Sequence, residues 1–195
     1  MKGGFNYRLW LFRSLVAIAV GLMIASFIMP WWTANVFAPN NVNIPDAIRI
    51  YGHGLQHDLI QLREYVEADE TPIEQTVLAW VYMAVSAGLI MFSTWLKGGK
   101  GRWLLGGLGL IYIAYAAIAA FVVISGRLGD WGFSLQGWSY LEEIDAGINA
   151  SLRFGYYLSY IAGGLCIILA LLRGIIAGRY ENAAHENKQH YIRPA

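Results

Sequence analysis

Residues 139–173, SYLEEIDAGINASLRFGYYLSYIAGGLCIILALLR, are the stretch from which the fold can best be judged. Between Phe154 and Leu172 the stretch carries no charge, and about 19 residues at about 1.5 Å each nearly cross a hydrocarbon core of about 30 Å. Ser139, with Glu142 three positions later, is typical of a helix N-terminus. The apolar residues that follow recur at the spacing of one helix face: Leu141, Ile144, Ile148 and Leu152. We therefore predict one helix from Ser139 to Arg173, with an amphipathic start and a membrane-spanning body.

The composition of the whole chain is typical of a membrane protein. Hydrophobic residues make up 57% and charged residues 14% of the 195 residues, whereas soluble domains average about 25% charged residues. The net charge of +1 argues against a sizeable surface for nucleic acid. Cys166 is the one cysteine, so an intramolecular disulfide is excluded. The length allows one helical bundle with a modest cap, so residues 1–195 are expected to form a single four-span membrane domain.

Three further uncharged stretches complete the predicted bundle. The four expected spans cover about residues 10–32, 74–96, 103–126 and 153–173. Residues 33–73 and 127–152 then form outer loops, and residues 174–195 form a cytoplasmic tail. The fold class that follows is an all-α membrane protein, a four-transmembrane-helix bundle with a small extracytoplasmic cap from the two loops.

The first outer loop contains signals for both a strand and a helix. Ile48 and Ile50 alternate with Arg49, which indicates a short strand over 47–51. An apolar stripe at helical spacing follows within 55–66: Leu55, Leu59, Leu62 and Val66. This stripe predicts a helix that lies on the membrane surface or against the second loop.

Residues 71–74, TPIE, carry a clear helix-start signal. Thr71 suits the N-cap, Pro72 the first helical position, and Glu74 the position from which a carboxylate reaches back to the cap. We therefore expect the second span to begin here and to continue through the uncharged stretch that ends at Leu96.

The first span has two possible interpretations. A basic start and a short apolar core also fit a cleaved signal peptide. Two tryptophans, Trp31 and Trp32, follow the apolar core directly, and Ala17, Gly21 and Ala25 form a strip of small residues four apart. Such strips let another helix backbone approach closely, so a retained membrane anchor is the prediction.

The distribution of charge predicts the orientation of the chain. The segments expected to lie inside hold 10 of the 14 basic residues: Lys2, Arg8, Arg13, Lys97, Lys100, Arg102, Arg173, Arg179, Lys188 and Arg193. Because basic residues are retained on the cytoplasmic side, both termini are expected there, in a protein integral to the cytoplasmic membrane. The outer segments hold 11 of the 13 acids, which we interpret as a solvated face, with a cation-gathering vestibule or a docking surface as alternatives.

Small residues and outer tryptophans are the candidate contact residues. The helix-packing candidates are Ala17, Gly21, Ala25, Gly109, Gly155, Ser159 and Gly163. The candidate contact residues in the outer loops are Trp31, Trp32, Trp131 and Trp138.

Candidate chemistry is sparse. His53 and His57 are four apart and would share a helix face, where they could ligate a metal such as zinc or copper. The glycines beside His53 favour a structural role at a turn instead. None of the spans contains a histidine for a haem iron, or an acid or lysine at mid-depth for a proton path. We therefore predict no cofactor, and expect lipid contacts. Asn149-Ala150-Ser151 matches the glycosylation pattern, which also arises often by chance.

The layout resembles the claudin-like tetraspan proteins. Four spans, inner termini, a long first outer loop, a shorter second one and a glycine-rich fourth span are shared, and Trp31 and Trp32 stand where that family has a tryptophan. Gly54-Leu55 is similar to the start of its Gly-Leu-Trp motif, but Gln56 replaces the tryptophan and the outer cysteine pair is absent. The resemblance implies a β-sheet cap, whereas the periodicity of 55–66 predicts helix. It assigns no functional residue.

These patterns favour a non-enzymatic protein. The leading hypothesis is a structural or accessory subunit that packs against other membrane protein subunits or copies of itself through its helices and outer loops. The alternatives are a small channel or carrier with an acidic outer vestibule, and a metal-dependent membrane enzyme subunit that uses His53 and His57.

Overall fold

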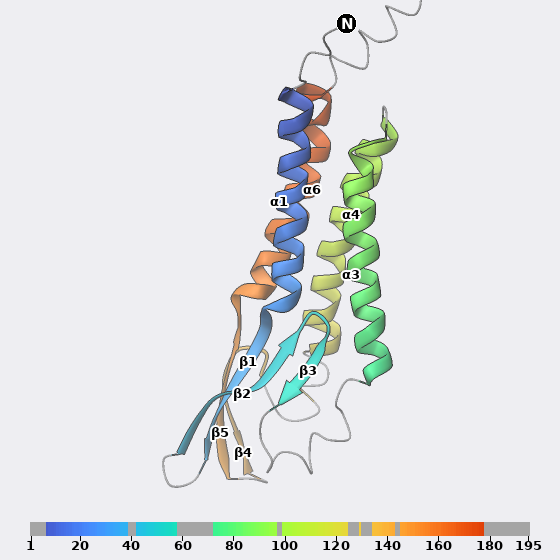
Figure 1. Cartoon of the computed structure of the whole chain (residues 1–195). Coiled ribbons are helices and arrows are strands. Elements are labelled where there is room, and N and C mark those ends of the chain that lie inside the picture. The colour runs from blue at the N-terminus through green and yellow to red at the C-terminus, as the bar shows by residue number, and fades with distance from the viewer. Residues whose placement is uncertain are drawn as a thin grey trace, which may run out of the picture.

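The computed structural model describes residues 7–38, 42–57, 72–96, 99–124, 129, 134–142 and 145–177, and it combines a helical bundle with a β-sheet (Figure 1). Four long helices of this part of the chain run side by side: α1 (Tyr7–Ile28), α3 (Ile73–Ser93), α4 (Gly99–Ile118) and α6 (Phe154–Ile176). A π-helical turn, η3 (Ala119–Ile124), continues α4. The strands lie at one end of the bundle, where α1 leads into the sheet and the sheet leads into α6.

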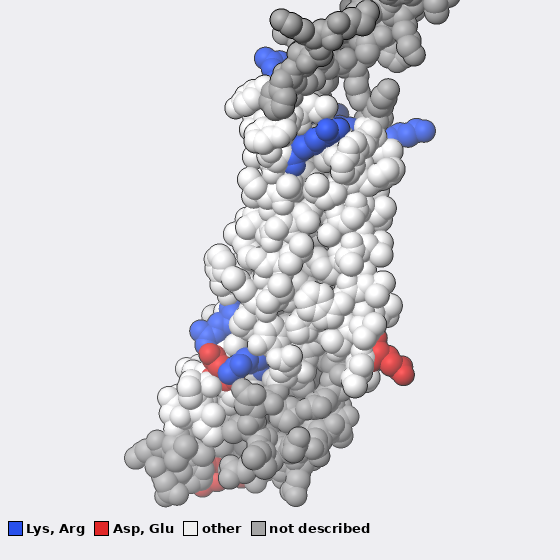
Figure 2. All heavy atoms as spheres, viewed as in Figure 1, with Lys and Arg blue, Asp and Glu red and all other residues white. Residues whose placement is uncertain are grey.

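The helices confirm that four segments are long and apolar enough to cross a membrane. The apolar helical stretches have 22, 21, 23 and 23 residues, which at about 1.5 Å per residue suffices for a hydrocarbon core of about 30 Å. Figure 2 shows the charged side chains at the two ends of the bundle, with an uncharged belt between them. This separation is the pattern expected when lipid tails surround the middle of the bundle.

The sheet overturns the all-α prediction. Its strands are β1 (Pro30–Ala38), β2 (Val42–Tyr51), β3 (Gly54–His57), β4 (Gly137–Leu141) and β5 (Ala146–Leu152). They form one antiparallel sheet in the order β3-β2-β1-β5-β4, so the two outer loops join at the β1–β5 pair. The fold is therefore a mixture of α and β structure, in which a bundle of helices carries a five-stranded sheet.

Alternation along the strands explains why the cap is a sheet. Trp32, Ala34 and Val36 are buried on one face of β1, and β5 brings Ala150 and Ile148 opposite the last two of these. The side chains between them lie on the opposite face, because side chains alternate across a strand. The buried face forms an apolar cluster of its own, separate from the core of the bundle.

The predicted helix start at Ser139 is wrong. Ser139 lies in β4, and α6 begins at Phe154. Ile148 and Leu152, which suggested a helix face, are four residues apart, and a separation of four also places two side chains on one face of a strand. The same ambiguity affects 55–66: Leu55 lies in β3, and residues 58–66 fall outside the described part of the chain.

Three boundaries can also be checked. The first span ends earlier than predicted, because α1 stops at Ile28 and Pro30 begins β1. The short strand predicted over 47–51 is confirmed as part of β2. Pro72 is the N-cap of α3 rather than its first helical residue, and it makes no side-chain capping bond; Thr71 lies outside the described residues.

Close backbone contacts hold the bundle together around α6. A Cβ atom on Gly109 of α4 would lie 2.7 Å from the carbonyl oxygen of Gly163 on α6, and a Cβ on Gly163 would lie 2.8 Å from that of Gly109. A Cβ on Gly155 would lie 2.7 Å from the carbonyl oxygens of Met29 and Pro30. Glycine therefore lets three chain segments touch at backbone distance.

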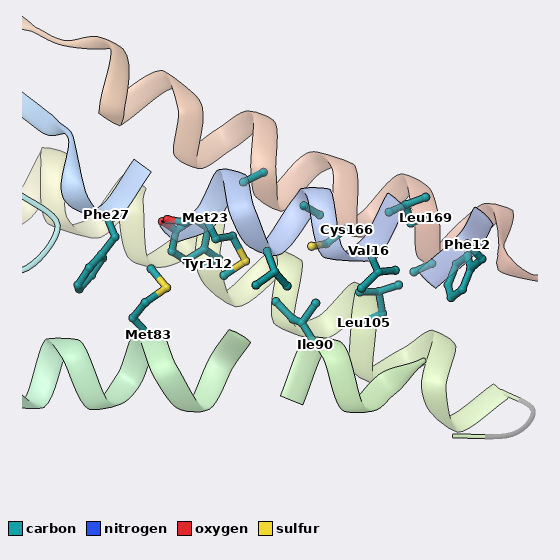
Figure 3. Packing of buried hydrophobic residues seen from close by; sticks show 14 residues of the cluster. Phe12, Val16, Met23, Phe27, Met83, Ile90, Leu105, Tyr112, Cys166 and Leu169 are labelled. Atoms are coloured by element: carbon teal, nitrogen blue, oxygen red, sulfur yellow. The ribbon is translucent and has the colours of Figure 1, made fainter. Parts of the chain in front are cut away.

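The core of the bundle fills the space between the helices. Its members come from all four long helices, and Figure 3 shows Val16, Ile90 and Leu105 meeting from α1, α3 and α4. Met23, Met83 and Tyr112 lie in the same cluster, nearer to the sheet. The packing of these side chains fixes the ends of the helices on which the sheet rests.

Candidate functional site

The turn between β2 and β3 fastens the sheet to the helices. The hydroxyl of Tyr115, on α4, donates a hydrogen bond to the carbonyl oxygen of Gly52 over 2.6 Å. A Cβ on Gly52 would lie 2.7 Å from the ring of Phe27 on α1 and 3.0 Å from the ring of Trp31. Only glycine allows this close approach without displacing those rings. Sequence reasoning noted Gly52 as a turn residue and did not identify its contact with the bundle.

His53 extends the same turn into an aromatic stack. Its ring lies between the rings of Tyr51 and of Trp80 on α3, whose centroids are 5.1 and 5.2 Å away. The ring of Phe27 makes an edge contact, with its centroid 5.6 Å from that of His53. Burial lowers the pKa of His53 because the stack excludes water from the charged form. His53 thus connects the turn to both α1 and α3.

The two histidines do not share a helix. His53 lies in the turn and His57 lies in β3, where its backbone pairs with Ile48. Within the described ranges, His, Cys, Asp and Glu residues form no group of three that could hold a metal ion. Metal binding by His53 and His57 stays a prediction.

Buried hydroxyls join α1, α4 and α6 near the sheet. The hydroxyl of Ser26 donates to the carbonyl oxygen of Gly155 over 3.0 Å and lies 3.1 Å from the hydroxyl of Tyr112. Tyr112 donates to the carbonyl oxygen of Met23 over 3.2 Å, and Trp31 donates to that of Ser26 over 2.8 Å. Each of these groups has a partner in the chain, as buried polar groups in an apolar medium require.

At the opposite end of the bundle, Arg173 of α6 caps α3. Its side chain is buried, and it donates to the carbonyl oxygens of Ser93 (2.7 Å) and Leu96. The guanidinium also lies over the ring of Phe12, 5.6 Å from its centroid. The last carbonyls of a helix carry a partial negative charge, which a buried cation stabilises. The charge distribution predicted a cytoplasmic location for Arg173, but nothing in the sequence pattern predicted this contact.

The predicted small packing residues divide into two groups. Gly109, Gly155, Ser159 and Gly163 are buried among the helices. Ala17 and Gly21 of α1 are exposed, and Ala25 is half-buried. A Cβ atom on Gly21 would meet nothing within 4 Å among the atoms considered around it. The strip on α1 therefore faces away from the other described helices.

The predicted contact tryptophans also fall into two groups, buried and exposed. Trp31 and Trp32 are fully buried, and Trp32 donates to the carbonyl oxygen of Leu135 over 2.7 Å. Trp138 on the edge strand β4 is 59% exposed, and its ring lies 5.1 Å from that of Phe37. Trp131 lies outside the described residues. Of the outer tryptophans that the structure describes, Trp138 is the one on the surface of the sheet.

Asn149 lies next to this tryptophan. It is exposed on β5, directly opposite Trp138 in the register of the two strands. The asparagine that matches the glycosylation pattern thus lies on the surface of the sheet, whereas the sequence pattern had predicted a helix there.

Comparison with known proteins assigns no function to the chain, so a function has to be argued from this geometry. No family model matches the chain, and no curated protein matches it.

Proposed function

We propose that this chain is a non-enzymatic structural or accessory subunit that packs laterally against other membrane proteins or copies of itself. The observation that supports it is the outward strip of Ala17 and Gly21 on α1. Inside the bundle, glycines are used for contacts between backbones, as at Gly109 of α4 and Gly163 of α6. A strip of the same kind that faces outward favours a second helix from another chain.

The exposure of α3 supports the same proposal. Only 22% of its apolar stretch is buried within this chain, compared with 39% for α1 and for α6. Gly88 of α3 is exposed, and in the described surroundings a Cβ atom there would meet nothing within 4 Å. Lipid tails pack against any apolar helix surface, whereas small residues on that surface favour close contact with another helix.

The proposed orientation places the termini in the cytoplasm and the sheet outside. Of the residues that the structure describes, Arg8, Lys100 and Arg102 lie on the helix ends away from the sheet, whereas Asp46 and Glu142 lie on the sheet side, together with the two basic residues Arg49 and Arg153. Because cytoplasmic segments keep basic residues, this distribution supports the assignment. The outer sheet then presents Trp138 for contacts with a partner outside the membrane.

A leucine at position 21 tests the lateral contact. In mild detergent the parent chain should elute with a partner or as an oligomer, and Gly21→Leu should shift it to the monomer, because the side chain fills the outward strip. Gly107→Leu is the matched control, since Gly107 is also exposed and equally open. Both variants should retain the thermal stability of the parent chain.

A parent chain that elutes as a lone monomer from native membranes would contradict the proposal. Equal loss of assembly in the Gly21 and Gly107 variants would also contradict it, since the effect would not then depend on the strip.

A further inference from the structure

Arg13 lies at the end of the bundle away from the sheet, where α1 passes the end of α3. It belongs to the second turn of α1, and its guanidinium lies over the ring of Trp95, 5.6 Å from the ring centroid. Trp95 follows the last residues of α3 and is 58% exposed. The face of a tryptophan ring attracts a cation. The ring therefore positions the guanidinium, but it supplies no oxygen to accept the N–H groups.

The buried Nε of Arg13 lacks an acceptor. Within the part of the chain that the structure describes, this atom has no hydrogen-bond partner. Arg173, at the same end of the bundle, provides the contrast: it lies over the ring of Phe12 and also donates to the carbonyl oxygens of Ser93 and Leu96. A buried N–H of a charged group without an acceptor costs free energy, so such groups are normally bonded. An acceptor from outside the chain would remove this cost.

The described charges around Arg13 are basic. Arginine keeps its positive charge throughout the physiological pH range. At the helix ends away from the sheet, the structure also describes Arg8, Lys100, Arg102 and Arg173. The acids among the described residues all lie on the side of the sheet: Asp46, Glu74, Glu142 and Asp145. On the face that Figure 2 shows, the charged side chains at the end away from the sheet are basic as well. The acceptor favoured here is therefore an anion.

The surroundings of Arg13 favour a lipid headgroup over a dissolved anion. Beyond Arg13, α1 carries no charged residue up to its end at Ile28, so Arg13 marks the boundary of the apolar belt. Phe92 and Trp95 are exposed at the end of α3. Arginine and tryptophan at such a boundary lie at the depth of lipid headgroups. Exposed rings can pack against the glycerol and acyl groups of a lipid, which a free anion does not have.

We propose that Arg13 binds the phosphate of an anionic phospholipid, while Trp95 packs against the glycerol and acyl part of the same lipid. A guanidinium can form two parallel hydrogen bonds with one phosphate. Arg13 is half-buried, and its Nε has no hydrogen bond among the described residues that would have to be broken for the group to turn towards a headgroup. The other basic residues at this end favour a lipid with a net negative charge over a zwitterionic one. The site requires that the helices cross a membrane, but it is independent of lateral assembly.

The test is a lipid titration of the full-length chain in mild detergent after removal of bound lipid, read by native mass spectrometry. Phosphatidylglycerol should bind more tightly than phosphatidylcholine. Arg13→Gln should weaken phosphatidylglycerol binding about tenfold, because a hydrogen bond from a charged group is lost. Arg13→Lys keeps the charge without the planar fork and should weaken binding less. Arg8→Gln is the matched control, since Arg8 is an exposed arginine of the same helix, and it should leave binding nearly unchanged.

Three results would contradict the proposal: equal effects of Arg13→Gln and Arg8→Gln, equal binding of the two lipids, or displacement of the lipid by inorganic phosphate at concentrations comparable with those of the lipid. Thermal unfolding of each variant shows whether it is folded. Trp95→Leu keeps the test decisive if Arg13→Gln does not fold. It should weaken phosphatidylglycerol binding about threefold through loss of the cation–π contact, and unchanged binding in the folded variant would refute the site.

Discussion

Helices α6 and α3 have similar lengths and compositions, yet they are held in different ways. Of their apolar stretches, 39% of α6 and 22% of α3 is buried. α6 touches α4 through Gly109 and Gly163 at backbone distance. α3 contributes Met83 and Ile90 to the core and is fastened near its two ends by contacts from elsewhere in the fold.

The end contacts of α3 come from outside the helix. At the end away from the sheet, Arg173 donates to the carbonyl oxygen of Ser93, and nearer to the sheet His53 stacks on Trp80. The position of a helix that packs through glycines along its length depends on the fit of the two backbones. The position of a helix that is fastened at its ends depends on a few specific side chains. The difference indicates that α6 organises the fold, and that α3 is the least buried of the four long helices.

Filling the contact between α4 and α6 should have the largest effect. Gly163→Leu should lower the free energy of unfolding by about 3 kcal/mol, because the new side chain has to displace the backbone of α4 and Ile113. Thermal or denaturant unfolding in detergent measures this change. At the next position, a Cβ atom on Gly164 would meet nothing within 4 Å, so Gly164→Leu should change stability little. Similar losses in the two variants would contradict the special role of the contact.

Removing the cap of α3 should have an intermediate effect. Arg173→Met should cost about 2 kcal/mol, since it leaves the carbonyl oxygens of Ser93 and Leu96 without their charged donor. Hydrogen exchange at the last turn of α3 should increase together with the loss of thermal stability. Arg102→Met, which removes an exposed arginine, serves as the control. Unchanged exchange at that turn in Arg173→Met would refute the cap.

The smallest effect should be a pH dependence that originates in His53. Burial lowers the pKa of His53 in the folded protein, so below about 6.5 the unfolded chain binds the proton first. Stability should be highest above that pH and should fall as the pH is lowered towards the depressed pKa. His53→Phe keeps a ring between Tyr51 and Trp80 and should remove this contribution.

The measurement is the free energy of unfolding of the parent and His53→Phe chains across that pH range. Parallel curves would show that His53 does not cause the pH dependence. The difference between the curves separates His53 from the other histidines, which both chains retain.

Two kinds of signal along the chain differed in how well they could be interpreted. The uncharged run from Phe154 to Leu172 indicates a helix that is long and apolar enough to cross a membrane, because its length and lack of charge are read within one segment. The preceding residues, with Ile148 and Leu152 four apart, fit a helix or a strand equally. Short amphipathic segments take their form from the partner on which they pack, and the partner here is β1, more than a hundred residues earlier in the chain.

The candidate sites show the same limit. Small residues at intervals of four indicated contact faces, but the sequence did not distinguish Gly163, which touches α4, from Gly21, which faces outward. The contact of Arg13 with Trp95 was not predicted, since the two residues are distant in the sequence and meet only where α1 lies beside α3. Residues brought together by the packing of distant helices leave no local pattern.

By itself, the sequence determined that four helices are long and apolar enough to cross a membrane, because the transfer of a helix into lipid depends on length and charge within one segment. The tertiary structure alone decided that the outer loops form a sheet, that Arg173 caps α3, and that Arg13 lies over Trp95. Those features depend on contacts between segments that are distant in the sequence. The free energy of such a contact depends on both segments together, so neither segment specifies it alone.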